Sequence, residues 1–304
     1  MSVLVIPEHD VRRLLPMDEC IEAMESVLGS LARGELHQPL RFVTRPPGAD
    51  SLMGFMPAHR SGDGSTWSLK EIVIAPGNPA RGLDTHQGAV LLHDGETGEL
   101  QAILNASPIT EIRTAAVSAV ATRALARPEA RTVAILGAGV QARSHADAMR
   151  SVLGDVEIRS WSRRDGGTAE AVLEGADIVC TCTSAREPIL RREWLAPGTH
   201  VNAVGSSLPS IRELDTETMS ACSLFVDRRE STLNESGDLL LAGLGEEHIR
   251  AELGEVLTGA HPGRADAEEL TVFKSLGLAV EDLAAAELIV RKAREEGAGT
   301  EVEF

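Results

Sequence analysis

The chain has 304 residues, a hydrophobic fraction of 43% and a charged fraction of 25%, so it suits one large globular domain or two ordinary ones. The formal net charge of −17 argues against a surface that binds nucleic acid or an anionic membrane. No apolar run reaches the ~20 residues that a membrane helix needs, so no membrane partner is expected.

The first part of the chain is predicted to form an antiparallel sheet with one helix. The helix is expected over residues 17–32, with Asp18 as its cap, because apolar residues recur there at helical spacing. Short apolar segments then predict strands over 52–56, 67–74, 88–93 and 99–104. The turn signal at 94–98 joins the last two strands as a hairpin.

The pattern changes near Pro108, where an Ala-rich segment predicts a long helix over residues 110–127. Strands and helices then alternate, which indicates a parallel, doubly wound sheet. The strands are expected over 131–136, 156–161, 177–183, 200–204 and 224–227, and the helices over 140–153 and 168–175. From Val272 to Ile289 one long helical pattern is expected to return to the first region, and the tail after Arg294 is expected to fray.

The segment Gly137-Ala138-Gly139-Val140-Gln141-Ala142 lies between a predicted strand and a predicted helix, as a dinucleotide-binding loop requires. Gly137 permits the tight turn, and Gly139 lets pyrophosphate approach the backbone. Ala142 takes the third position, where a small residue allows helix and strand to pack closely. The helix N-terminus then offers free N–H groups to the phosphates. The alternative is a tight turn without a ligand.

The residues after the second parallel strand favour NADP(H) over NAD(H). An acidic residue at this strand end binds the ribose hydroxyls of NAD, whereas arginine accommodates the extra phosphate of NADP. The chain reads Ser162-Arg163-Arg164, and no acid occurs before Asp165. Both arginines would offer several donors to a phosphate. The alternative is a pair of solvated surface arginines.

Cysteines and histidines give no sign of a metal site or a disulfide framework. Neither a Cys-x-x-Cys pair nor a metal-ligand spacing of histidines occurs, so no bound metal is expected. The cysteines are predicted to be reduced thiols of a cytoplasmic protein, and the N-terminus lacks the pattern of a signal peptide. The cysteines are Cys20, Cys180, Cys182 and Cys222.

Several motifs in order resemble the ornithine cyclodeaminase/mu-crystallin family. They are residues 110–116 (TEIRTAA), the glycine loop, residues 198–205 (GTHVNAVG) and residues 271–282 (TVFKSLGLAVED). The resemblance runs from about Gln38 to Ile289. It implies an α/β protein with a Rossmann-type doubly wound sheet, shortened at one edge, and an α+β substrate and dimerisation domain.

The resemblance also implies domain boundaries and a homodimer. Residues 1–115 and 270–304 would form the substrate domain, and residues 116–269 the NAD(P)-binding domain. Thr85, Val204 and Ser275 would contact the cofactor. The chain is unusually short between Arg164 and Thr168, so one helix and one edge strand of the family's sheet are expected to be missing.

By the same resemblance, Arg41, Lys70 and Arg113 would bind a substrate carboxylate. Charge-assisted donors suit such a group, and a lysine with apolar neighbours can have a lowered pKa and pass a proton. Lys70 and Arg113 are therefore predicted to be catalytic. For Lys70 the alternative is a strand-end lysine that reaches solvent. For Arg113 it is an ion pair with Glu111 or another acid.

The two acids that handle ornithine amines in cyclodeaminases are replaced here by Gly54 and Ser207, and Ser207 would lie in the substrate site. The mu-crystallin branch, which consists of NADPH-dependent ketimine reductases, has a small residue and a serine at these places. The predicted activity is therefore reduction of small cyclic imino acids. Three alternatives stay open: an alanine dehydrogenase-like enzyme, an ornithine cyclodeaminase and a non-enzymatic NADP-dependent binding protein.

Overall fold

The computed structural model describes residues 2–62 and 64–304, and the chain divides into two compact units. Unit 1 contains the residues up to Arg113 together with Leu278–Phe304, and unit 2 contains Thr114–Gly277. Residues 270–277 therefore cluster with unit 2 and not with the C-terminal helix. Within the described ranges, no helix combines the length and apolar character that crossing a membrane requires.

The sheet of unit 1 has the order β15-β1-β7-β6-β5-β4-β2, and β3 also pairs with β4. Its pairs are antiparallel except for β1 and β7, which run parallel. The predicted antiparallel sheet is thus confirmed and extended at both ends. The strands are β1 (Ser2–Ile6), β2 (Leu36–His37), β3 (Phe42–Thr44), β4 (Leu52–Arg60), β5 (Thr66–Ile74), β6 (His86–Asp94), β7 (Leu100–Asn105) and β15 (Thr300–Glu303).

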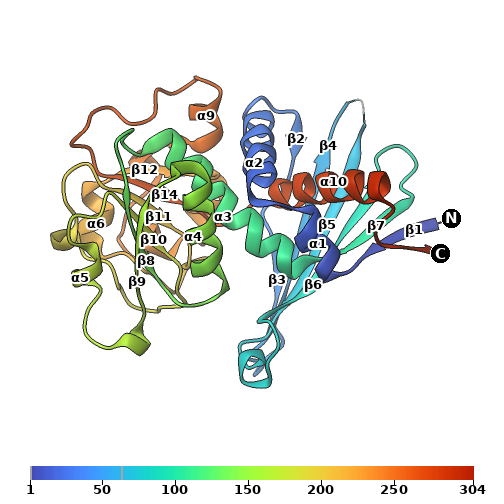
Figure 1. Ribbon diagram of the computed structural model, residues 1–304, viewed down its shortest axis with the longest axis horizontal. Helices are drawn as coiled ribbons and strands as arrows, with labels where there is room; N and C mark the ends of the chain where they lie inside the picture. Colours follow the sequence, from blue (N-terminus) through green and yellow to red (C-terminus); the bar gives the residue numbers. More distant parts are fainter. Residues whose placement is uncertain (1, 63) are drawn as a thin grey trace. The chain divides into compact units, whose positions relative to one another are not determined.

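Helix α10 (Ala279–Glu296) packs on β5, β4 and β6 and against α2 (Met17–Ala32), so the C-terminal helix does pack on the first region. Figure 1 shows the red α10 beside the blue α2. The range of α2 is as predicted, but its cap is Pro16 and Asp18 lies in the first turn. There its charge complements the helix dipole. Unit 1 also contains α1 (Glu8–Leu14), the 3₁₀ helix η1 (Asn78–Arg81) and the start of α3 (Ala106–Leu125).

The C-terminal tail is a strand, so the expectation of a frayed tail is wrong. β15 pairs antiparallel with β1 from Ser2↔Glu303 to Val5↔Thr300. The two ends of the chain therefore lie side by side (Figure 1). This pairing gives the backbone of residues 300–303 hydrogen-bond partners that no local pattern in the sequence reveals.

Unit 2 is a Rossmann-type doubly wound sheet, as predicted. Its strands run parallel in the order β13-β12-β14-β11-β10-β8-β9. The edge strand β9 is followed by η2 (Arg163–Asp165) and the four-residue helix α5 (Glu170–Leu173) before β10, which gives the short link expected there. The strands are β8 (Thr132–Leu136), β9 (Glu157–Trp161), β10 (Ile178–Thr181), β11 (His200–Ala203), β12 (Ser223–Val226), β13 (Ile249–Glu252) and β14 (Thr271–Lys274).

Helices cover both faces of this sheet. On one face α3 approaches β11, because Asn202 Nδ2 donates to Thr122 Oγ1 at 2.9 Å. On the other face Leu173, Met219 and Leu239 join a core with buried strand residues. The remaining helices are α4 (Val140–Leu153), α5 (Glu170–Leu173), α6 (Thr216–Ala221), α7 (Arg229–Glu235), α8 (Gly237–Leu240), α9 (Leu253–Leu257), η3 (Arg192–Trp194) and η4 (Glu246–His248).

The predicted helix from Val272 to Ile289 is wrong in its first half. Val272 lies in β14, in the interior of the parallel sheet between β12 and β11. Gly277 then takes a φ of +79°, which interrupts any helix, and α10 begins at Ala279. A four-residue segment with only two apolar residues fits a strand and a helical turn equally well, so the pattern alone did not separate the two elements.

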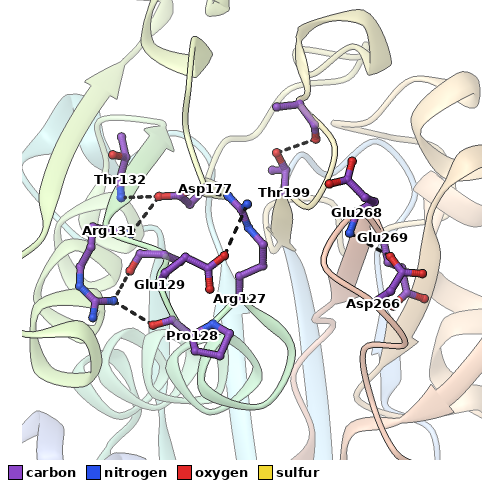
Figure 2. A network of polar contacts seen from close by, with 12 residues as sticks. Arg127, Pro128, Glu129, Arg131, Thr132, Asp177, Thr199, Asp266, Glu268 and Glu269 are labelled. Carbon is purple, nitrogen blue, oxygen red and sulfur yellow. Dashed lines mark hydrogen bonds and ion pairs between the residues drawn. The ribbon is translucent and has the colours of Figure 1, made fainter.

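Polar side chains form hydrogen bonds and an ion pair at the amino edge of the second sheet (Figure 2). Asp177, just before β10, accepts hydrogen bonds from the backbone N–H groups of Arg131 and Thr132 at 2.9 and 3.0 Å. It also pairs with Arg127, which follows α3. These groups tie β8, β10 and the end of α3 together, so the polar side chains at this edge are engaged in holding the fold.

Candidate functional site

The glycine loop lies at the carboxyl edge of the second sheet. Gly137 has a φ of +142°, and a Cβ there would lie 2.5 Å from the carbonyl oxygen of Cys182, so only glycine fits. At Gly139, the N-cap of α4, a Cβ would meet no protein atom within 4 Å. That open space beside free N–H groups is what a phosphate requires. The loop thus has the features of a dinucleotide site.

His145 links α4 to α3 next to this loop. Its Nδ1 lies 2.8 Å from the carbonyl oxygen of Gln141, and its Nε2 lies 2.9 Å from Ser118 Oγ. Because a carbonyl can only accept, Nδ1 carries the proton and Nε2 accepts from the serine. Burial lowers the pKa of His145 to about 4, so the ring is neutral near pH 7. We read His145 as a structural residue.

The two arginines after β9 are exposed and make no ion pair among the described residues. Asp165, the first acid in this segment, is occupied: its Oδ2 accepts from the N–H and the hydroxyl of Ser162 at 2.7 and 2.8 Å. Arg163 and Arg164 therefore remain available to an anion, whereas the hydroxyl of Ser162 is already engaged in a capping box.

Val204, Ser207 and Ser275 follow strands β11 and β14, at the same carboxyl edge as the glycine loop. Val204 and Ser275 are fixed by backbone hydrogen bonds to Thr181 and Ala203, at 3.1 and 3.0 Å. Ser207 is half-buried in the loop after Val204. The residues predicted to bind the cofactor in unit 2 thus come together at one edge, the position where doubly wound sheets bind dinucleotides.

A buried carboxylate that no sequence motif predicts to have a role lies beneath these loops. Glu213 accepts from the Thr181 hydroxyl, the N–H and hydroxyl of Thr183, and the Gly205 N–H, at 2.7–2.8 Å. Burial raises its pKa. Glu213 therefore holds the segments after β10 and β11 together.

Lys274 continues this network from the end of β14. Its Nζ lies 2.9 Å from Asp238 Oδ2 and donates to the Ala203 carbonyl at 3.2 Å. Asp238 Oδ1 in turn accepts from the Glu213 N–H at 2.8 Å. Both side chains of the ion pair are fully buried. The Lys274 side chain thus stabilises the end of β14, which Ser275 directly follows.

Unit 1 brings Lys70 into a buried ion pair. Lys70 lies on β5, is 2% exposed, and its Nζ lies 2.6 Å from Asp282 Oδ2. The alternative of a lysine that reaches solvent is therefore wrong. Burial lowers the pKa of Lys70 to about 8, against the opposing effect of Asp282, and the charges of Arg113 and Arg41 lower it further. An ammonium with such a pKa can release and regain a proton near neutral pH.

Arg113 lies on α3 and pairs with two buried acids of α10. Its Nη1 is 2.7 Å from Glu281 Oε2, and its Nε is 3.1 Å from Asp282 Oδ1. The alternative left open for Arg113, an ion pair with Glu111 or another acid, is confirmed for two other acids, and Glu111 pairs with Arg12. Both acids lie in the first turn of α10, so the helix dipole and the ion pairs with the cations both stabilise their negative charges.

Arg41 is half-buried and lies near the same cluster, since its charge acts on Lys70. Its segment is anchored to α10, because Gln38 Oε1 accepts from the Val280 N–H at 3.0 Å. Two of the three cations predicted to bind a carboxylate, Lys70 and Arg113, therefore contact one helix N-terminus, and the charge of Arg41 acts on Lys70. Residues 281 and 282 belong to the motif at 271–282, but the motif does not reveal that their side chains pair with Lys70 and Arg113.

Two other predicted positions lie in unit 1. Thr85, just before β6, accepts a hydrogen bond from the Ala75 N–H at 2.9 Å through its backbone carbonyl. His86 follows, and its pKa is lowered by burial and by the charges of Lys70 and Arg113. Gly54 lies opposite Ile72, on the face of the sheet that carries Lys70. The described residues contain no cluster of three or more His, Cys, Asp or Glu suited to a metal ion.

The sequence matches the ornithine cyclodeaminase/mu-crystallin family over residues 2–174 and 166–297. It is 41% identical to the mouse (Mus musculus) ketimine reductase mu-crystallin over 288 residues, 88% of this chain and 90% of the mouse protein.

Solved structures agree with this assignment. The Δ1-pyrroline-2-carboxylate reductase of Thermococcus litoralis, in complex with NADH and L-proline, superposes with a TM-score of 0.91 at 34% identity, over 99% of this chain and 100% of that one. An archaeal alanine dehydrogenase dimer with bound NAD gives a TM-score of 0.94 at 30% identity, over 100% of both chains. The chain therefore belongs to the ornithine cyclodeaminase/mu-crystallin family.

Proposed function

We propose that this protein is an NADPH-dependent reductase of small cyclic imino acids, such as pyrroline- or piperideine-2-carboxylate. The observation that carries the proposal is the buried group of Lys70 and Arg113, with Arg41 beside it, because three cations suit a substrate carboxylate. Unit 1 would be the substrate-binding and dimerisation domain, and unit 2 the NAD(P)-binding domain. Two relatives are a ketimine reductase and a pyrroline-2-carboxylate reductase, which supports the substrate class.

Reduction of a C=N bond adds a hydride to carbon and a proton to nitrogen. The bound nicotinamide would supply the hydride, held by the glycine loop and the residues at the carboxyl edge of unit 2. Arg41 and Arg113 would orient the substrate through its carboxylate. Lys70 would also contact the carboxylate, and its ammonium would donate a proton to the imine nitrogen, directly or through water.

The test is turnover of purified protein with NADPH and each cyclic imino acid, followed by loss of NADPH absorbance. We expect both the five- and six-membered ring acids to be reduced to the saturated amino acid. Absence of turnover with every cyclic and acyclic imino acid would refute the proposal. Turnover of pyruvate with ammonia in place of the cyclic acids would favour a second candidate, an alanine dehydrogenase, which the archaeal relative supports.

The pH profile should report Lys70. Since its pKa is about 8, we expect kcat/KM to fall above that pH, by about tenfold per unit, as the ammonium loses its proton. The control is Lys70→Arg, because a guanidinium stays charged throughout this range. An alkaline limb that persists unchanged in this variant would belong to the substrate and would contradict the role given to Lys70.

The exposed pair Arg163 and Arg164 supports the preference for NADPH, since neither has an acidic partner among the described residues. Replacing both by alanine should raise KM for NADPH by about 10- to 100-fold, the loss expected for charge-assisted hydrogen bonds to a phosphate. KM for NADH should change less than about twofold. Arg150→Ala, which removes an exposed arginine of α4, is the matched control. An equal effect on both cofactors would contradict this assignment.

The outer face of the unit 1 sheet supports a homodimer. On β5, Lys70 and its alternate neighbours face α10, so Trp67, Leu69 and Val73 point to the opposite face. Pro57 and Leu91 lie opposite Leu69 on the two neighbouring strands, and Trp67 is 45% exposed. Exposed apolar side chains on one sheet face can mark a protein interface. Sedimentation of the intact protein as a monomer would refute the dimer.

We further propose a cytoplasmic location, where reduced thiols persist. All four cysteines are free and buried. Fractionation of the source cells, with the protein followed by antibody, tests this: recovery in an exported fraction would contradict it.

A further inference from the structure

The first turn of α10 gathers charged groups from four separate parts of unit 1. Asp282 and Glu281 belong to α10 itself, Lys70 comes from β5, and Arg113 comes from α3. The charge of Arg41, in the segment before β3, also acts on Lys70. The acids are 1% and 0% exposed, so their charges are stabilised chiefly by these cations.

We propose that Asp282 is a positioning residue of the substrate site, whose single carboxylate bridges Lys70 Nζ and Arg113 Nε and fixes both cations for a substrate carboxylate. This inference rests on the proposed function, since it assigns a task within that same site. Asp282 itself would not touch the substrate. It would act through the two cations that do.

The geometry supports a bridging role. Asp282 uses Oδ2 for Lys70 at 2.6 Å and Oδ1 for Arg113 at 3.1 Å, so one short side chain sets the separation of two long ones. Lysine and arginine side chains are otherwise free to occupy many rotamers. The bridge lies on an 18-residue helix whose first turn is fastened by the bond from Val280 to Gln38. A rigid support of this kind is what a preorganised binding site needs.

Asp282 and Glu281 differ in what they contact, which makes them a matched pair for experiment. Glu281 binds Arg113 through Nη1 at 2.7 Å, whereas the ion pair of Lys70 is with Asp282. The other charged or titratable groups that act on Lys70 are Arg113 from α3 and Arg41 from the segment before β3, and His86 faces it from β6. Loss of the Asp282 charge should therefore disfavour the ammonium form of Lys70, and loss of the Glu281 charge should not.

The chain has three lysines, Lys70, Lys274 and Lys292, so the titration of Lys70 can be followed directly. Protein labelled with ¹³Cε-lysine should give three resolvable signals, and Lys70→Arg identifies one of them. In Asp282→Asn the midpoint for Lys70 should fall by at least about one pH unit below that of the unmodified protein. In Glu281→Gln it should stay near its original value. An unchanged midpoint in Asp282→Asn, or an equal shift in Glu281→Gln, would overturn the inference.

Steady-state kinetics give a second measurement, which distinguishes a positioning residue from a residue that only stabilises the fold. Asp282→Asn should raise KM for the imino acid by about tenfold or more and move the alkaline limb to lower pH, with the affinity for NADPH unchanged. Asp282→Glu keeps the charge, so it should keep the Lys70 midpoint but still raise KM, because the longer side chain displaces the cations. A lowered Lys70 midpoint in Asp282→Glu would contradict the charge argument. This variant provides the test even if Asp282→Asn does not fold.

The two proposals fail in different ways. If the unmodified protein reduces no imino acid, the proposed function is wrong. The lysine titration and the binding of L-proline, measured by calorimetry, need no turnover. Loss of L-proline binding in Asp282→Asn supports the positioning role, and unaltered binding refutes it.

Discussion

Arg113→Met is expected to lower both stability and substrate binding. The substitution leaves Glu281 and Asp282 buried with one cation fewer, and removal of one partner from a buried ion pair costs about 3–5 kcal/mol. Under the proposed function, Arg113 also contacts the substrate carboxylate, and loss of that charge-assisted contact should lower kcat/KM by a further factor of about 10 to 100. Urea unfolding followed by circular dichroism measures the first effect, and steady-state kinetics measure the second.

Arg12→Met is the matched control for stability, because Arg12 also pairs with a glutamate of α3, Glu111, at 2.8 Å. Its side chain is 42% exposed, and an exposed ion pair contributes less than about 1 kcal/mol. Arg113→Lys separates charge from geometry, since it keeps the charge but lacks the planar fork. It should retain more stability than the methionine variant and still bind the substrate poorly. Equal unfolding free energies for the Arg12 and Arg113 variants would contradict the importance of the buried cluster.

Gly137→Ala should nearly abolish cofactor binding. The added Cβ would lie 2.5 Å from the Cys182 carbonyl at a φ of +142°, so the turn must move or hold strain of about 1–3 kcal/mol. Either response displaces the N–H groups that would bind phosphate. We expect the Kd for NADPH, measured by calorimetry, to rise by at least about tenfold, together with a lower melting temperature.

Gly139→Ala should separate ligand contact from backbone strain. Its φ is −84°, and an added Cβ meets no protein atom within 4 Å, so the melting temperature should stay within about one or two degrees. If pyrophosphate approaches this atom, the Kd for NADPH should still rise. A variant with normal stability and normal affinity would show that the phosphates lie elsewhere.

The local elements could be predicted because their patterns are complete within a short segment. Helix α4 begins at Val140 and ends at Leu153, as the glycine loop and the apolar spacing indicate. By contrast, β14 is a four-residue strand whose assignment depends on its neighbours β11 and β12. Likewise, β15 is defined by pairing with β1, at the other end of the chain. Such non-local pairing leaves little local trace in a sequence.

The candidate site shows the same division. The glycine loop, Arg163 and the cations could be located from motifs and from the family resemblance. Their partners could not, because a sequence does not reveal which acid a buried arginine will meet. Asp282 lies 169 positions from Arg113, and Asp238 is buried beside Lys274 without any shared motif. Burial creates these pairings, since an unpaired charge in the interior is costly.

The separation between Arg113 and Asp282 also has a consequence during protein synthesis. A ribosome adds about 5–20 residues per second, so roughly 10–30 s pass between the emergence of these two residues. All of unit 2 is made in that interval, between the two segments of unit 1. The nascent chain can thus build its dinucleotide fold while Lys70 and Arg113 still lack their acids. We expect this buried ion-pair cluster, the proposed substrate site, to be the last part of the protein to mature, and chains that terminate before residue 281 to be recognised by chaperones as unfinished.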